Sequence, residues 1–75
     1  MAKKTNEEQS RVYKRIDLVG VSGKSFESAI ENAIAKASGS LTDLRWFEVV
    51  EMRGAIQAGK VTQYQVVLKV SFEVK

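Results

Sequence analysis

Residues 22–37 read SGKSFESAIENAIAKA, and this stretch decides the fold class of the chain. Its apolar side chains recur at i, i+3, i+4, i+7, i+8 and i+11, the spacing of one face of an α-helix. This stripe consists of Phe26, Ala29, Ile30, Ala33, Ile34 and Ala37. Turn and N-cap residues precede it at positions 22–25, and Gly39 offers a natural stop after it. The sequence therefore predicts one amphipathic helix.

Strand patterns lie on both sides of this helix. Before it, residues 12–22 are rich in β-branched and aromatic side chains and alternate between apolar and polar. After it, residues 41–52 predict a second strand, and residues 61–74 predict a long third strand with clean alternation. Gly54 and Gly59 favour a turn within residues 53–60, which makes the last two strands an antiparallel hairpin. The predicted fold is α+β, in the order β-α-β-β.

The alternation separates two faces of the predicted sheet. One face of the third strand is apolar: Tyr64, Val66, Leu68, Val70 and Phe72. We expect the helix to cover this face, with Phe47 and Val49 as its neighbours on the second strand. The side chains expected on the opposite, open face are Trp46, Glu48, Val50, Gln65 and Val67.

Composition limits how this fold can be stabilised. A chain of 75 residues has room for one small core, which disulfides, metals or oligomerisation often support. The sequence contains no Cys and no His, which excludes disulfides and removes the commonest zinc ligand and the usual general base. Oligomerisation remains, and exposed apolar side chains on the open face favour it as well. We therefore expect a homo-oligomer.

The N-terminal segment differs from the rest of the chain. Residues 1–10 show no periodic apolar pattern and predict a flexible arm ahead of a domain over residues 11–75. The arm does not resemble a secretory signal, and no apolar run approaches the ~20 residues of a membrane span. We expect a cytoplasmic protein without a membrane partner. The net charge of +3 permits ligands that carry phosphate, as well as nucleic acid.

Two residues of the open face allow a structural and a functional interpretation. Trp46 is the sole tryptophan, which in a small domain usually packs in a core or interface, but it can also serve as a stacking platform for a flat ligand. Gln65 is either a solvated glutamine or a paired donor and acceptor for the edge of a heterocycle. With a turn near Ala58, the two side chains lie about 15–20 Å apart in one subunit. They can hold one small ligand across a subunit boundary, or where a bulge shortens the path.

Four segments together resemble the dodecins, a family of small flavin-binding proteins. The segments are VYKRIDLVGVS, SGKSFESAIENAIAKA, LRWFEVVEMRG and GKVTQYQVVLKVSFEV, which occur in this order between Val12 and Val74. The resemblance implies a strand-helix-strand-strand fold with the three-stranded sheet wrapped partly around the helix. It also implies a hollow homododecamer that stores and photoprotects FMN or riboflavin and is not an enzyme.

The resemblance also implies a set of flavin-binding residues. Trp46 corresponds to the tryptophan that stacks flavins in pairs between symmetry-related subunits, and Gln65 corresponds to the glutamine that holds the polar edge of the ring. Arg45 and Glu51 are expected beside the ring or the ribityl chain. Arg53 is expected to face the phosphate, because a guanidinium can bind phosphate through two parallel hydrogen bonds.

Glu73 departs from the pattern of the family. Some relatives carry a basic residue there, which can serve a second, nucleotide-type ligand, and an acidic side chain does not suit that role. No catalytic residue and no metal ligand is predicted. The alternative function is a single-stranded nucleic-acid-binding module with an aromatic sheet face. Glu48, Glu51 and Glu73 on the same face do not favour a nucleic-acid partner.

Overall fold

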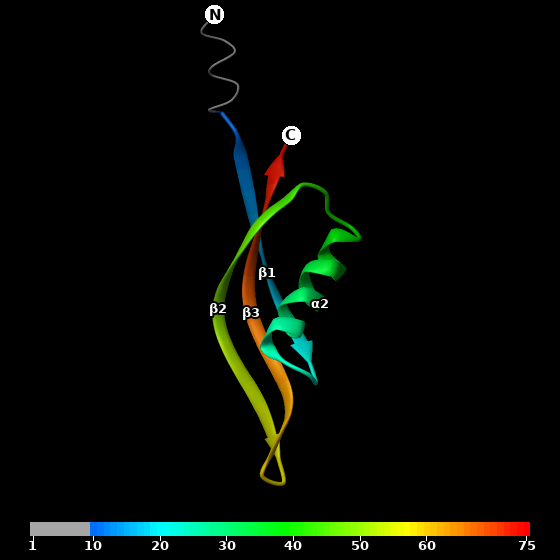
Figure 1. The fold of residues 1–75 in the computed structure, drawn as a ribbon. Helices are drawn as coiled ribbons and strands as arrows, with labels where there is room; N and C mark the ends of the chain where they lie inside the picture. The colour runs from blue at the N-terminus through cyan, green and yellow to red at the C-terminus, as the bar shows by residue number, and fades with distance from the viewer. Residues whose placement is uncertain (1–9) are drawn as a thin grey trace, which may run out of the picture.

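The computed structural model describes residues 10–75, which form one helix and three strands (Figure 1). The elements are β1 (Val12–Ser22), α2 (Phe26–Ser38), β2 (Leu44–Gln57) and β3 (Lys60–Val74). The sheet is antiparallel with the order β1-β3-β2, so β3 is the central strand. The predicted α+β fold and its β-α-β-β order are confirmed. The predicted arm, residues 1–10, lies outside the described residues except for Ser10, and within residues 10–75 no helix is long and apolar enough to cross a membrane.

The helix begins and ends where the local sequence predicts. Ser25 is the N-cap, and its Oγ accepts a hydrogen bond from the backbone N–H of Ser28 at 3.0 Å. Glu27 in the first turn and Lys36 in the last turn have the charges that the helix dipole favours. Gly39 is the C-cap residue. These contacts satisfy helix ends that would otherwise need water.

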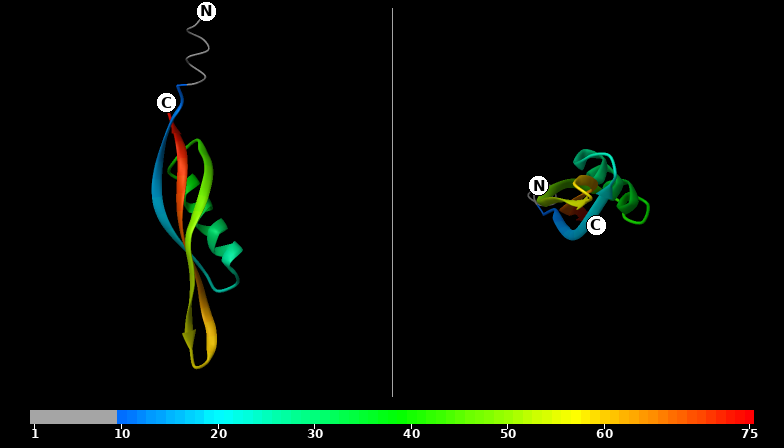
Figure 2. Two further views of the ribbon diagram at one scale, coloured as in Figure 1. Left: turned by 90° about the vertical axis from the view of Figure 1, so that its left-hand side faces the viewer. Right: turned by 90° about the horizontal axis from the view of Figure 1, so that it is seen from below.

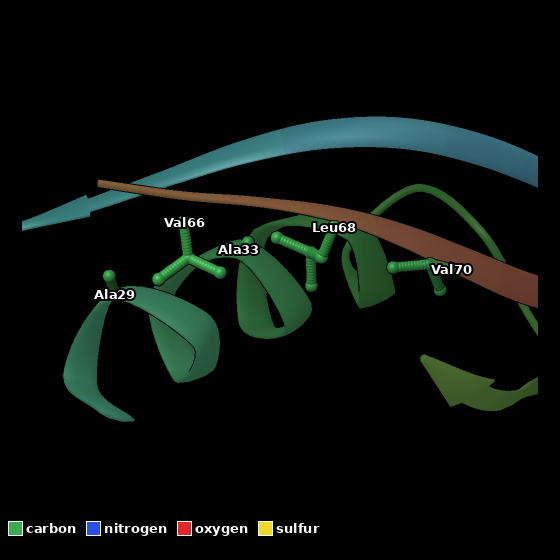
Figure 3. Close-up of a cluster of buried hydrophobic side chains, with 5 residues drawn as sticks. All are labelled: Ala29, Ala33, Val66, Leu68 and Val70. Atoms are coloured by element: carbon green, nitrogen blue, oxygen red, sulfur yellow. The ribbon is translucent and has the colours of Figure 1, made fainter. Parts of the chain in front are cut away.

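The core lies between α2 and the central strand (Figure 3). Its buried side chains are alanines of the helix and larger aliphatic residues of β3: Ala29, Ala33, Val66, Leu68 and Val70. The small alanine side chains let the helix approach β1 closely at Gly20. A Cβ atom at Gly20 would overlap the carbonyl oxygen of Ala29 and lie 3.1 Å from the Cβ of Ala33. Glycine is therefore required at this position by the distance between helix and sheet.

The second strand is less covered than the sequence predicts. Phe47 and Val49 pair with Val70 and Leu68, which places them on the helix side of the sheet as expected. Their exposed fractions are nevertheless 45% and 43%. The reason is that α2 packs against β1 and β3, so that β2 extends beyond the cover of the helix (Figure 2). The expected role of Phe47 and Val49 as core residues is wrong.

The hairpin closes in a two-residue turn. Ala58 and Gly59 have φ angles of 52° and 76°, the left-handed values that a type I′ turn requires. Gly54, expected within the turn, is instead paired in the ladder between β2 and β3. The second strand consequently covers Leu44–Gln57 and not residues 41–52.

Irregularities in β2 change which side chains face the helix. Shifts of register fall between Leu44 and Trp46, between Val49 and Glu51, and between Ala55 and Ile56. The second shift leaves Val50 as an extra residue, and one extra residue reverses the faces of all positions that follow it. Glu51 and Arg53 therefore share the open face with Trp46, whereas an unbulged strand would turn both toward the helix side.

The contact at Gly20 can be tested by adding a methyl group. We expect Gly20→Ala to lower the free energy of unfolding by about 1–3 kcal/mol, because the helix must move away from β1. Urea unfolding at a fixed protein concentration measures the change. Gly23→Ala is the matched control, since no atom lies within 4 Å of a Cβ there, and its effect should stay within about 0.5 kcal/mol. Equal stability of the two variants would contradict the proposed close packing.

Candidate functional site

The open face of the sheet carries two groups of predicted site residues at separate places. Trp46 lies opposite Ser71, and Gln65 lies opposite Arg53, nearer to the hairpin turn. Positions 65 and 71 are six residues apart on β3, which corresponds to about 20 Å at ~3.3 Å per residue. The separation that the sequence predicts for Trp46 and Gln65 within one subunit is confirmed, and the bulges of β2 do not shorten it.

Trp46 forms an aromatic pair with a residue that the sequence reasoning did not select. The ring of Tyr13, on β1, lies 4.8 Å from the ring of Trp46 between centroids, with the planes tilted by 59°. Trp46 retains an exposed fraction of 46%. The signal for Tyr13 was present, since the alternation of β1 places it on the same face as Arg15 and Asp17. Tyr13 supports the indole from one side and leaves much of it accessible.

Ser71, which lies opposite Trp46 in the sheet, carries a buried hydroxyl. Ser71 pairs with Arg15 on β1 and with Trp46 on β2, and its exposed fraction is 1%. Within the described residues its Oγ has no hydrogen-bond partner. A buried polar atom without a partner costs stability, because it has lost its water and gained nothing in return.

Arg45, next to the tryptophan, is held by carboxylates. Its Nη2 donates a hydrogen bond to Oε1 of Glu73 at 2.8 Å and lies 3.6 Å from Oδ1 of Asp43. The hydrogen bond to Glu73, reinforced by the charges of Glu73 and Asp43, raises the pKa of the Arg45 guanidinium above its ordinary value. Glu73 thus serves here as the partner of a neighbouring arginine.

The second group of site residues forms a hydrogen-bonded row across β2 and β3. Arg53 Nε donates to Gln65 Oε1 at 2.7 Å, and Gln65 Nε2 donates to Gln63 Oε1 at 2.7 Å. The Nη1 of Arg53 lies 3.4 Å from Oε1 of Glu51. Three predicted residues meet in this polar row, and Gln63 joins them. Sequence reasoning missed Gln63, although it lies two positions before Gln65 and therefore on the same face.

Ion pairs occupy the face between the two groups. Lys69 Nζ lies 3.0 Å from Oδ1 of Asp17, and Arg15 Nη1 lies 2.8 Å from Oε1 of Glu48. All four side chains are exposed by a third or more, so each pair contributes only about 0–1 kcal/mol to stability. Residues 10–75 contain no group of three or more acidic side chains arranged to hold a metal ion.

Comparison with known proteins identifies the family. The family model for dodecin matches residues 12–75, nearly the whole described chain. The chain belongs to the dodecin family. A dodecin of Thermus thermophilus is 48% identical over 65 residues, which cover 87% of this chain and 94% of that protein. A calcium dodecin of Mycobacterium tuberculosis is 42% identical over 65 residues, which cover 85% and 90%.

Solved structures of dodecins share the fold described above. The dodecin of Streptomyces coelicolor matches with a TM-score of 0.84 at 38% identity, over 87% of this chain and 93% of that one. The membership predicted from the four sequence segments is confirmed. As a family, the dodecins are small oligomeric binding proteins that are not known as enzymes.

The buried hydroxyl leads to a test of stability. We expect Ser71→Ala to leave the free energy of unfolding unchanged or to raise it by up to about 1 kcal/mol, because the substitution removes a polar atom that has no partner. Ser25→Ala provides the contrast, since loss of this N-cap should cost about 1 kcal/mol. Urea unfolding at equal protein concentration compares the two. If Ser71→Ala costs as much as Ser25→Ala, the hydroxyl makes a stabilising contact in the folded protein.

Proposed function

We propose that this dodecin stores and photoprotects a flavin, FMN or riboflavin, as a homododecamer, and that it does not catalyse a reaction. The observation that carries the proposal is the half-exposed Trp46 on the open sheet face of a chain in this family. Its indole offers a flat apolar surface on which an aromatic ring can stack, with flavin pairs placed between the Trp46 side chains of symmetry-related subunits.

The residues present suit a flavin ring. Stacking on Trp46 supplies about 0.5–1.5 kcal/mol beyond the burial of apolar area. The amide of Gln65 combines a donor and an acceptor, which match the polar edge of the ring. Because Trp46 and Gln65 lie about 20 Å apart in one subunit, a single ring that contacts both must take them from different subunits. Flavin binding is thereby coupled to assembly.

The charged residues predicted to bind the flavin belong to the two groups of site residues around Trp46 and around Gln65. Arg45 accompanies Trp46, whereas Glu51 and Arg53 accompany Gln65 in the polar row. Both arginines already make hydrogen bonds within the chain, Arg45 to Glu73 and Arg53 to Gln65. Recognition then depends mainly on the ring, which FMN and riboflavin share. We therefore expect the protein to accept either flavin.

The helix side of the sheet supports self-assembly. A groove of about 480 Å³ lies between the helix and β2, lined by Glu27, Ile30, Glu31, Ile34, Ala35 and Phe47. The radius of gyration is 16.6 Å, against about 11 Å for a compact chain of this length. A second copy that covers the groove would remove apolar surface from water, which contributes about 25 cal/mol per Å². An elongated subunit with an uncovered groove suits a multi-subunit shell.

The proposed role requires binding and not turnover. An indole in contact with a photoexcited flavin can donate an electron and quench the excited state before it reacts with oxygen.

A cytoplasmic location stays a prediction. No observation favours the alternative nucleic-acid-binding function, because Arg15, Arg45, Arg53 and Lys69 of the open face each contact an acidic side chain.

Purification of the protein tests the proposal directly. We expect a yellow protein with flavin absorbance that elutes at about twelve times the subunit mass of 8.4 kDa. A colourless protein that neither binds added flavin nor quenches its fluorescence would overturn the proposal. Salt-sensitive binding of single-stranded DNA would support the alternative instead.

Substitution of the tryptophan tests the stacking surface. We expect Trp46→Ala to weaken flavin binding by more than about tenfold, equivalent to about 1.4 kcal/mol, while the assembly persists. Fluorescence titration measures the affinity, and size-exclusion chromatography measures the assembly. Trp46→Phe is the control, since it keeps an aromatic ring and should lose less affinity. If Trp46→Ala dissociates into smaller species, Trp46 acts mainly as an interface residue and the stacking role is wrong.

A further inference from the structure

In the polar row of Arg53, Gln65 and Gln63, Arg53 determines the orientation of the Gln65 amide. Arg53 carries only hydrogen-bond donors and no acceptor. Its Nε donates to Oε1 of Gln65 at 2.7 Å, so the carbonyl end of the Gln65 amide must face Arg53. The amino end then faces Gln63, whose Oε1 accepts its hydrogen bond at 2.7 Å.

The reverse orientation of the Gln65 amide is disfavoured by Arg53. A flipped amide would turn its N–H groups toward the Nε–H of Arg53 and its carbonyl toward Oε1 of Gln63. Gln63 can rotate its own amide to follow such a flip, but Arg53 has no acceptor to offer. Arg53 therefore sets the orientation, and Gln63 stabilises it.

A Gln65 amide held in this way presents a defined pattern to a ligand. One lone pair of Oε1 and one N–H of Nε2 remain beyond the bonds to Arg53 and Gln63, which leaves an acceptor beside a donor. The pyrimidine edge of a flavin carries an N–H beside carbonyl oxygens, and this edge is complementary to such a pair. Without these bonds the side-chain torsions of Gln65 would be free as well as the amide flip, so the matching orientation would be populated less and binding would carry an entropic cost.

We propose that Arg53 and Gln63 are positioning residues that fix the amide of Gln65 for recognition of the flavin ring, and that Arg53 is not a phosphate ligand. The inference rests on the proposed flavin function and sharpens it. The position of Glu51 agrees with this role, because a carboxylate 3.4 Å from Nη1 offsets the positive charge that would attract a phosphate. Under this proposal, Arg53 makes a contact within the chain in place of the phosphate contact that the family resemblance implies.

Two flavins that differ only in the phosphate separate the two roles. We expect Arg53→Met and Gln63→Val each to weaken binding of riboflavin and of FMN by the same factor, about tenfold, since one hydrogen bond to the amide is lost. The ratio of the two Kd values should stay as in the wild type. Gln63→Glu is the matched control, because its carboxylate still accepts from Nε2 of Gln65 and should retain most of the affinity. Fluorescence titration of the assembled protein measures all Kd values.

The double variant tests whether both residues act through Gln65. We expect the double variant Arg53→Met with Gln63→Val to have flavin Kd values no more than about twofold above those of Arg53→Met alone. Once Arg53→Met has freed the Gln65 amide, the second substitution cannot free it again. Fully additive losses would overturn the inference, as would a loss confined to FMN or wild-type affinity in Arg53→Met. If Arg53→Met does not assemble, Gln63→Val and Gln63→Glu test the same amide. A wild-type protein that binds neither flavin overturns the proposed function itself and is thereby distinguished from these outcomes.

Discussion

Ala29 and Ala33 of the helix rest directly on the backbone of β1 at Gly20, with no side chain between them. This contact ties the helix to one side of the sheet and to its central strand. The outer strand β2 is left uncovered, so Phe47 remains half exposed beside an apolar groove. The uncovered apolar surface therefore originates in the packing of the single subunit. A bulkier residue at Gly20 would move the helix away from the core that it completes.

On the opposite side of the sheet, an extra residue in β2 decides which charges reach the candidate site. Val50 interrupts the pairing with β3, and the side chains that follow exchange faces. Glu51 and Arg53 thereby join Gln65, while Trp46, before the interruption, keeps the face that simple alternation assigns to it. The polar row and the aromatic pair share one surface only because the strand is irregular between them.

These features differ in how far the sequence could predict them. The helix and the strand order follow from periods of 3.6 and 2 residues, which are local properties of the chain. The sequence predicts too wide a turn because Gly54 suggests a break, whereas within residues 53–60 only Ala58 and Gly59 adopt the left-handed conformation. The exposure of Phe47 could not be predicted either, because it depends on where the helix lies across the sheet.

The candidate site shows the same limit. The places of Trp46 and Gln65 on the open face follow from alternation, and their separation follows from the strand register. The partners of the predicted residues were not predictable, because a pairing such as Arg53 with Gln65 or Arg45 with Glu73 depends on bulges that leave no clear mark in the sequence. Tyr13 was overlooked because its contact with Trp46 reaches from one outer strand to the other across β3.

The central strand β3 sets the distance between the aromatic pair of Trp46 and Tyr13 and the polar row. It is paired on both sides along most of its length, so it can neither fold back nor shorten. An insertion or deletion of one residue between Gln65 and Ser71 would turn one group toward the helix, and a change of two residues would shift the spacing by about 7 Å. In this part of the chain the outward side chains between the two groups can vary, but its length and the buried Val66, Leu68 and Val70 are constrained.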